Sequence, residues 1–167
     1  MEFRADDRPD PLDIEFLEAQ IRREASAATG LGEEVELAIV LREGGAIVAG
    51  ISGWTWGDCC ELQNLWVDPA HRGRGLATQL IVAAEAEAAA RGCSQTVHLT
   101  YDFQARALYE KVGYELVGRV EGFPSGTDLL WFRKGLTHAE SLAEWETSRG
   151  TTGDSIVGAT GQPGEHN

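Results

Sequence analysis

A short glycine-rich segment between two ordered stretches is the part of this sequence best suited to chemistry. It reads Asp68-Pro69-Ala70-His71-Arg72-Gly73-Arg74-Gly75-Leu76-Ala77, and helical periodicity follows it. Glycines let successive backbone N–H groups turn toward one point, and the start of a helix adds unpaired N–H donors and a positive dipole end. With His71, Arg72 and Arg74 beside them, these groups would form an anion cradle, for which a diphosphate is the natural guest.

Other uses of this loop stay open from its own residues. The GxGxxG fingerprint of dinucleotide-binding folds is absent, and no GKS or GKT follows, so neither a Rossmann nor a P-loop phosphate site is indicated. The segment from Arg72 to Gly75 could instead be a tight turn or part of an RNA-binding segment. The loop alone does not decide between an anion site, a tight turn and an RNA-binding segment, so the charge of the whole chain and the sequence on either side of the loop must be considered.

The chain is strongly acidic. Its 167 residues include 14 Lys and Arg against 27 Asp and Glu, which gives a formal net charge of −13. Such a field repels nucleic-acid backbones and anionic membrane surfaces, and it attracts cationic molecules such as amines, although it could also serve solubility alone. We therefore expect no nucleic-acid partner and no membrane partner, and a field that favours a cationic amine.

Cysteine usage indicates a reducing compartment. Cys59, Cys60 and Cys93 are odd in number and lack a CxxC metal spacing, so neither a disulfide framework nor a metal site is predicted. Residues 1–7 lack the basic and apolar regions of a signal peptide, and no apolar run approaches the ~20 residues that a membrane span needs. We therefore expect a cytoplasmic protein without a bound metal.

The predicted elements place the loop between a strand and a helix. Strands in series with tight turns predict an antiparallel meander, and the strand-loop-helix-strand run predicts that the strands ending at Val67 and Thr100 are parallel. One domain over residues 1–136 is expected, with an extension over 137–167 that begins as a short helix and continues as a disordered tail. The expected elements are a helix from Pro11 to the glycines at 30–32, strands over 35–41, 46–56 and 60–67, a helix over 76–91, a strand over 96–100, a helix over about 103–112, and strands over 114–120 and 128–133.

Two blocks of the sequence resemble the signatures of the GNAT superfamily of N-acetyltransferases. The first is Leu65-Trp66-Val67-Asp68-Pro69 followed by Arg72-x-x-Gly75-x-Ala77, similar to a hydrophobic strand, an acidic-proline turn and the pattern [Q/R]-x-x-G-x-[G/A]. The second is Phe103-Gln104-Ala105-Arg106-Ala107-Leu108-Tyr109-Glu110-Lys111-Val112-Gly113-Tyr114. The resemblance covers roughly residues 2–135. Its FQAxxxYEKxGYE block is similar to that of a bacterial subgroup, from which Arg106 and Thr127 depart.

The resemblance implies both a fold and an activity. The fold would be α/β (α+β), with a mixed central sheet of about six or seven strands, one parallel and splayed pair, and about four flanking helices. The strand before the loop would carry a β-bulge. The activity would be that of an acetyl-CoA-dependent N-acetyltransferase, in which a primary amine of a small molecule attacks the thioester directly in a ternary complex.

The resemblance also assigns the groups that would bind acetyl-CoA, the cosubstrate. The strand end would offer backbone groups to the pantetheine arm, and an N–H near Val67 would polarise the thioester carbonyl. The loop and the first helical turn would hold the pyrophosphate. The implied cofactor-binding residues are Leu65, Trp66, Val67, Arg72, Gly73, Arg74, Gly75, Leu76, Ala77, Thr78 and Gln104.

Two further residues receive catalytic roles from the resemblance. Tyr109 matches the motif tyrosine near the cofactor sulfur and would be the general acid for the departing thiolate. Glu61, eleven positions before Arg72, would be the base for the amine, with Asp102 as the alternative. Strict strand alternation puts Glu61, Gln63 and Leu65 on one face. His98 is expected to be a packed core residue rather than a catalyst.

Other functions stay open at this point. The chain could be a protein acetyltransferase acting on lysines or N-termini, or a non-catalytic acyl-CoA-binding domain. A homodimer is also compatible with the family. The acceptor would be selected by residues 12–32 and 121–128, and neither segment names a molecule.

Overall fold

The computed structural model describes residues 5–136 as two separate units, one up to residue 33 and one from residue 34 onward. The first unit holds helix α1 (Pro11–Thr29), with proline at its start. The Asp10 side chain accepts a hydrogen bond from the Leu12 N–H at 2.9 Å, and Gly30 ends the helix in the left-handed conformation with φ 70°. Both predicted ends of this helix are confirmed.

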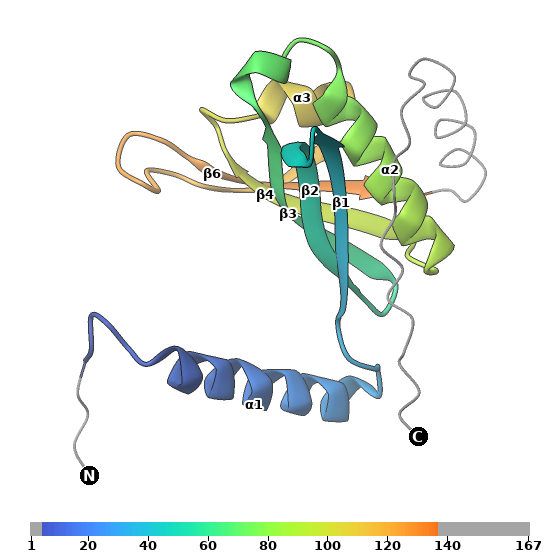
Figure 1. The fold of residues 1–167 in the computed structure, drawn as a ribbon. Helices are drawn as coiled ribbons and strands as arrows, with labels where there is room; N and C mark the ends of the chain where they lie inside the picture. The colour runs from blue at the N-terminus through green and yellow to red at the C-terminus, as the bar shows by residue number, and fades with distance from the viewer. Residues whose placement is uncertain (1–4, 137–167) are drawn as a thin grey trace. The chain divides into compact units, whose positions relative to one another are not determined.

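The second unit is built on a six-stranded sheet in the order β1-β2-β3-β4-β6-β5 (Figure 1). The described residues contain three α-helices, one fewer than the number expected. The predicted short helix after residue 137 lies outside the described residues. The elements of the second unit are β1 (Val35–Glu43), β2 (Ala46–Trp56), β3 (Cys59–Val67), the 3₁₀ helix η1 (Pro69–His71), α2 (Leu76–Ala90), β4 (Gln95–Tyr101), α3 (Arg106–Lys111), β5 (Glu115–Val120) and β6 (Leu129–Gly135).

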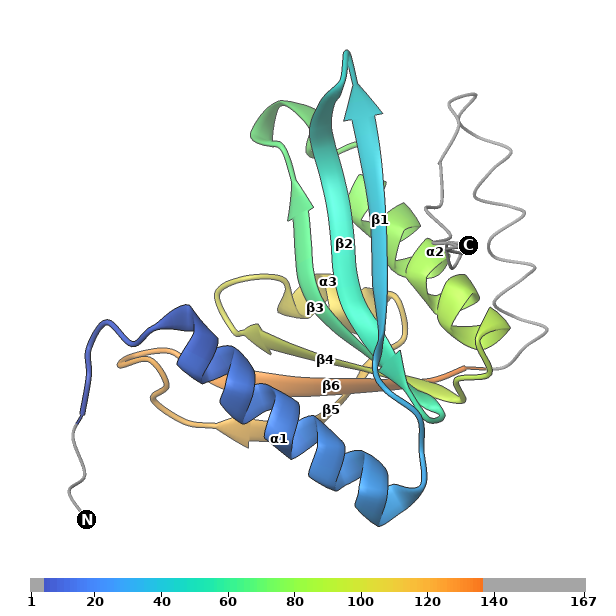
Figure 2. The same cartoon turned by 60° about the horizontal axis from the view of Figure 1, so that its bottom comes forward.

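The sheet contains one parallel pair, as predicted. Strands β3 and β4 pair over only four positions, from Cys59 opposite Gln95 to Leu62 opposite His98, whereas the other neighbours are antiparallel. Beyond Leu62 the two strands separate, and Figure 2 shows them running in clearly different directions. The sheet therefore opens into a wedge at the end of β3 that leads into the loop.

A β-bulge in β3 fixes where this separation occurs. Ser52 pairs with Asn64 but Gly53 pairs with Leu62, so Gln63 is an extra residue on β3. The strands approach so closely here that a Cβ on Gly53 would lie 1.9 Å from the carbonyl oxygen of Glu61. Glycine at position 53 is what permits the bulge.

The bulge overturns one prediction. Before it, Leu62 is buried in the core, whereas after it Leu65 packs against the same core, because the extra residue reverses the alternation. Glu61 and Leu65 therefore face opposite sides of the sheet, and the prediction that they share a face is wrong.

Helix α2 covers the core face of the sheet (Figure 1). Its inner surface is mostly alanine, which lets the helix lie close to the strands and bury Ile81 completely. Glu85 on α2 is 2% exposed and pairs with the Lys134 ammonium of β6 at 2.7 Å. This partly buried ion pair connects the helix to the half of the sheet beyond the wedge.

Helix α3 begins later than predicted, at Arg106 rather than near residue 103. The side-chain oxygen of Gln104 accepts hydrogen bonds from the Thr100 hydroxyl at 3.1 Å and the Tyr101 N–H at 3.2 Å. These contacts hold a turn after β4, because a side-chain oxygen offers the backbone an alternative to helical hydrogen bonding.

Candidate active site

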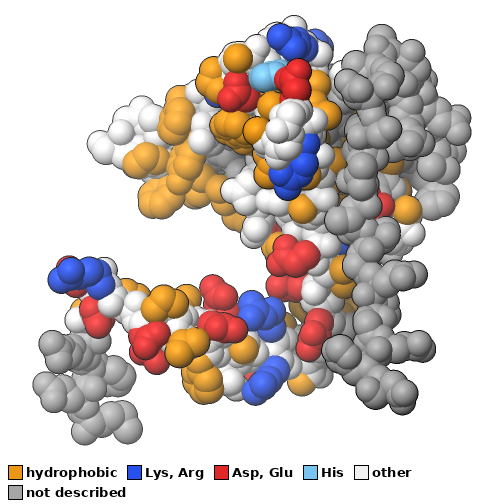
Figure 3. Space-filling view, in the orientation of Figure 1, with side chains coloured by type: hydrophobic (Ala, Val, Ile, Leu, Met, Phe, Trp, Pro, Cys, Tyr) orange, Lys and Arg blue, Asp and Glu red, His pale blue; other side chains and the backbone are white. Residues whose placement is uncertain are grey.

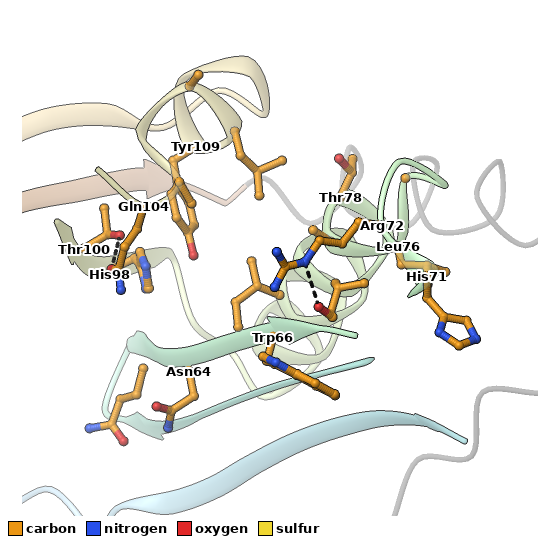
Figure 4. A pocket seen from close by; sticks show the side chains of 18 of the residues that line it. Asn64, Trp66, His71, Arg72, Leu76, Thr78, His98, Thr100, Gln104 and Tyr109 are labelled. Carbon is orange, nitrogen blue, oxygen red and sulfur yellow. Dashed lines mark hydrogen bonds between the residues drawn. The ribbon is translucent and has the colours of Figure 1, made fainter. Parts of the chain in front are cut away.

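A pocket of about 820 Å³ occupies the wedge between β3 and β4 (Figure 4). Its wall comes from the end of β3, the loop, the first turn of α2, the end of β4 and α3. Apart from the end of β4, these are the segments from which the sequence predicted a site. The predicted residues that line it are Leu65, Trp66, Val67, Arg72, Gly73, Gly75, Leu76, Ala77, Thr78, Gln104 and Tyr109.

The loop end of the pocket presents backbone groups. Gly73 and Gly75 have φ of 75° and 77°, in the left-handed region that other residues rarely adopt. Helix α2 begins directly after Gly75, and no side chain of the described residues caps its start. The N–H groups of its first turn, at Leu76 to Thr78, are therefore directed toward the pocket end where an anion would gain most from them.

Both arginines of the loop contact backbone carbonyls. The Arg72 Nε donates to the Val67 carbonyl at 3.0 Å, which folds the guanidinium back along the pocket wall (Figure 4). Arg74 donates to the Ala70 carbonyl at 3.4 Å and does not line the pocket. Of the two, Arg72 is the one placed to meet a guest.

His71 ties the loop to the β1–β2 hairpin. Its Nε2 lies 2.7 Å from a Glu43 carboxylate oxygen and its Nδ1 lies 3.3 Å from Asp68. The hydrogen bonds to Glu43 and then to Asp68 raise the pKa of His71, because both carboxylates favour the imidazolium. In the space-filling view a histidine surface lies between acidic side chains at this end of the molecule (Figure 3). Asp68 also accepts from the Ala70 N–H at 2.8 Å, which caps η1 and helps to hold its own pKa low.

The opposite end of the pocket is made of buried side chains. Tyr109 on α3 is 1% exposed, and its hydroxyl points toward the pocket (Figure 4). Burial raises its pKa, so the phenol stays neutral and keeps a proton to donate. His98 on β4 stacks on the Tyr109 ring with centroids 4.2 Å apart.

The two candidate bases lie outside the pocket wall. Glu61 precedes the bulge and does not line the pocket, but the amide nitrogen of Gln63, which does line it, donates to the Glu61 carboxylate at 3.4 Å. Asp102 does not line the pocket, and its backbone N–H donates to the Asp128 carbonyl.

The three cysteines also lie away from the pocket wall. Burial raises the pKa of Cys60 to about 12, and it raises those of Cys59 and Cys93 as well. All three thiols are therefore protonated near neutral pH and are poor nucleophiles.

Some pocket residues were not predicted from the sequence. Gln63 and Asn64 enter the wall because the bulge exposes two successive residues. His98, at the last paired position of β4, and Thr100, beyond it, enter the wall because β3 and β4 separate after the Leu62–His98 pair. The sequence did carry a signal for the two β4 residues: His98 and Thr100 are polar side chains at alternate positions of a strand, on the face that is buried.

Comparison with known proteins identifies the family. The sequence matches the Acetyltransferase (GNAT) family over residues 2–114, and the chain belongs to this family. It is 37% identical over 97 residues to the blasticidin-S acetyltransferase of Streptomyces morookaense, spanning 56% of this chain and 69% of that protein.

Solved structures share the fold. The crystal structure of an acetyltransferase from Agrobacterium tumefaciens matches with a TM-score of 0.76 and 28% identity over 81% of this chain and all of that one. An aminoglycoside 6'-N-acetyltransferase solved with coenzyme A matches with a TM-score of 0.56 and 20% identity, over 82% of this chain and 98% of that one. These matches confirm the predicted mixed α/β fold with one parallel pair. Within residues 5–136, no helix combines the length and apolar character that a membrane span requires.

Proposed function

We propose that this protein is an N-acetyltransferase that transfers the acetyl group of acetyl-CoA to the primary amine of a small molecule, by direct attack in a ternary complex. The observation that carries the proposal is the wedge between β3 and β4, which joins a backbone anion cradle at one end to a buried tyrosine at the other. A cosubstrate with a diphosphate at one end, a long arm and a thioester at the other end matches the order of these groups along the pocket.

Acetyl-CoA would be held by groups of three kinds. The first-turn N–H groups of α2 and the glycines of the loop would bind the pyrophosphate, with the Arg72 guanidinium beside them. Among the described residues, no strand pairs with the backbone of Leu65 to Val67 on its β4 side, so its groups there can hydrogen-bond to the amides of the arm, except for the Val67 carbonyl that Arg72 contacts. Gln104 has its side-chain oxygen occupied, so its NH₂ end is the donor available to a ligand.

Tyr109 would donate a hydrogen bond to the sulfur as the C–S bond breaks. Because burial raises its pKa, complete proton transfer to a thiolate is unfavourable in the empty pocket, whereas donation from the neutral phenol is not. Its contribution is therefore to stabilise the charge developing on sulfur.

Glu61 would accept the amine proton through an intervening water. The carboxylate does not line the pocket itself, but it accepts a hydrogen bond from Gln63, which does. A relay through water suits that position, and proximity of the two substrates would supply much of the rate enhancement.

The acceptor we propose is a cationic amine with an apolar or planar part. The net charge of −13 favours the approach of such a molecule. Aromatic rings gather where β4 leaves the wedge, with Tyr101 stacked on Phe103 at 5.4 Å and near Phe123 at 6.4 Å. The similarity to a protein named for the acetylation of blasticidin-S supports a small-molecule acceptor over a protein lysine.

Isothermal titration with acetyl-CoA tests the proposal. We expect micromolar binding to the wild type and a loss of tenfold or more, about 1.4 kcal/mol, in Arg72→Ala. Arg74→Ala should change affinity less, and the double variant should resemble Arg72→Ala. Arg119→Ala is the charge-matched control, since Arg119 pairs with Asp128 and does not line the pocket.

Absence of binding to acetyl-CoA and to longer acyl-CoAs would overturn the proposed function. Binding without thiol release across a panel of cationic amines and a lysine peptide would instead favour a non-catalytic acyl-CoA-binding domain. Release with the peptide alone would favour a protein acetyltransferase.

A further inference from the structure

His98 occupies the point where the wedge opens, and the proposed reaction does not use it. It is the last residue of β4 that pairs with β3, opposite Leu62. It is 4% exposed and lines the pocket (Figure 4). An apolar residue would be the ordinary choice at a buried position in the middle of a strand, because a buried polar ring costs free energy unless its nitrogens are satisfied.

One ring nitrogen of His98 joins the two strands. Its Nδ1 lies 2.6 Å from the carbonyl oxygen of Leu62 on β3. A carbonyl can only accept, so Nδ1 must carry the proton and the ring must be in the Nδ1–H form. Burial lowers the pKa of His98 and keeps the ring neutral, which leaves Nε2 as the nitrogen without a proton. The side chain therefore adds a hydrogen bond across the last paired position, one residue before the bulge.

The same ring supports Tyr109. The two rings stack with an interplanar angle of 28°, whereas Tyr114 meets Tyr109 edge-on at 5.4 Å and Phe132 stacks at 5.8 Å. Neither Tyr114 nor Phe132 lines the pocket. Of these three partner rings, that of His98 is the one that also lines the pocket, so it is the contact best placed to limit how far the phenol turns on that side.

We propose that His98 is a positioning residue for acetyl transfer: its Nδ1–H bond to Leu62 sets where the wedge opens, and its ring sets the direction of the Tyr109 hydroxyl. This inference rests on the proposed function. The His98 side chain would then have two effects, one on the width of the cofactor wedge and one on the chemical step.

Two substitutions divide these effects. His98→Asn keeps an N–H donor near the position of Nδ1 and removes the ring, whereas His98→Phe keeps a ring against Tyr109 and removes the donor. Thr96→Val is the matched control, because Thr96 is buried on the same face of β4 and donates to Tyr114 at 2.8 Å without lining the pocket.

The split between binding and turnover is the decisive readout. For His98→Asn we expect acetyl-CoA affinity within threefold of wild type and kcat lower by tenfold or more. For His98→Phe we expect affinity weaker by tenfold or more and kcat at saturation within threefold. Thr96→Val should lower the melting temperature and leave both constants within twofold. If both His98 variants behave like Thr96→Val, His98 is a core residue only and the inference is overturned.

Two measurements on the ligand-free protein complement the kinetics. Nitrogen-15 NMR of the histidine ring should show the Nδ1–H form at neutral pH, and an Nε2–H form would overturn the inference. Amide hydrogen exchange at the end of β3 should be faster in His98→Phe than in His98→Asn. Equal exchange rates would contradict the proposal that His98 sets where the wedge opens. A wild type that binds no acyl-CoA overturns the proposed function as well, whereas an active wild type with unaffected variants overturns this inference alone.

Discussion

The two ends of the pocket are built by different means. The loop end uses backbone N–H groups, glycines in left-handed conformations and exposed charged side chains. The other end uses buried rings, with Tyr109 at 1% and His98 at 4% exposure. The histidines show the contrast, because carboxylates raise the pKa of His71 whereas burial lowers that of His98.

This difference matches two kinds of task. A charged group such as a diphosphate needs many donors with little preference for one geometry, which an open loop can supply. A hydrogen bond to a developing charge needs one donor at one position, which requires a side chain held on all sides. Substitutions at the two ends should therefore affect different steps, and the bulge between them should affect both.

Gly53→Ala should have the largest effect. The added Cβ would lie 1.9 Å from the Glu61 carbonyl oxygen, so the paired strands at the bulge must move apart. We expect a loss of about 3 kcal/mol or more in the free energy of unfolding, measured by urea denaturation. The fraction of the variant that folds should bind acetyl-CoA more weakly than wild type does. Gly135→Ala is the control, since a Cβ there meets no atom of the described residues within 4 Å. Equal stability of the two variants would show that the bulge is not held by this close approach.

Tyr109→Phe should affect the buried end alone. Loss of the hydroxyl should lower kcat by about 100-fold and leave the affinity for acetyl-CoA within threefold, because the ring and its packing remain. Steady-state thiol release together with titration calorimetry measures both quantities. Tyr114→Phe is the matched control: this buried tyrosine does not line the pocket, so the change should reduce stability rather than kcat. Similar kcat values for both variants would contradict the role given to Tyr109.

His71→Gln should have the smallest effect, confined to the loop end and dependent on pH. The folded-state pKa of His71 is raised above 6.5, so its contribution to stability is fully present below that pH and is lost as the pH rises through the folded value. Melting temperatures of wild type and variant should differ most in mildly acid buffer at low salt and converge at alkaline pH. A difference that stays constant with pH would show that the Glu43 and Asp68 contacts do not depend on the charge of the ring.

Much of the fold could be predicted because its signals are local. The helix from Pro11 to Thr29 has a capping aspartate before it and a glycine after it, and the strand-loop-helix-strand order determines the parallel pair. The loop and Tyr109 were predicted to lie at one site from residue types and the family resemblance, and both line the pocket.

What could not be predicted depends on one inserted residue and on tertiary contacts. Strict alternation placed Glu61 on the same face as Leu65, and only the pairing of β2 with β3 shows that Gln63 is extra. Gly53 was the available signal, since a glycine within a strand often marks a bulge or a close approach. His98 was expected to be packed in the core, and it is buried. Its place in the pocket wall could not be predicted, because its two partners, Leu62 and Tyr109, come from distant parts of the chain.

The protonated cysteines have a practical consequence for enzymology. Transfer of an acetyl group is most simply followed by the colour that a disulfide reagent gives with free coenzyme A, and reactive thiols on the enzyme would add to that signal. Because Cys60 and Cys93 are buried and the pKa values of all three cysteines are raised, the native protein should react with such a reagent slowly. A fast background therefore reports unfolding, so one cuvette can measure both turnover and the integrity of the enzyme.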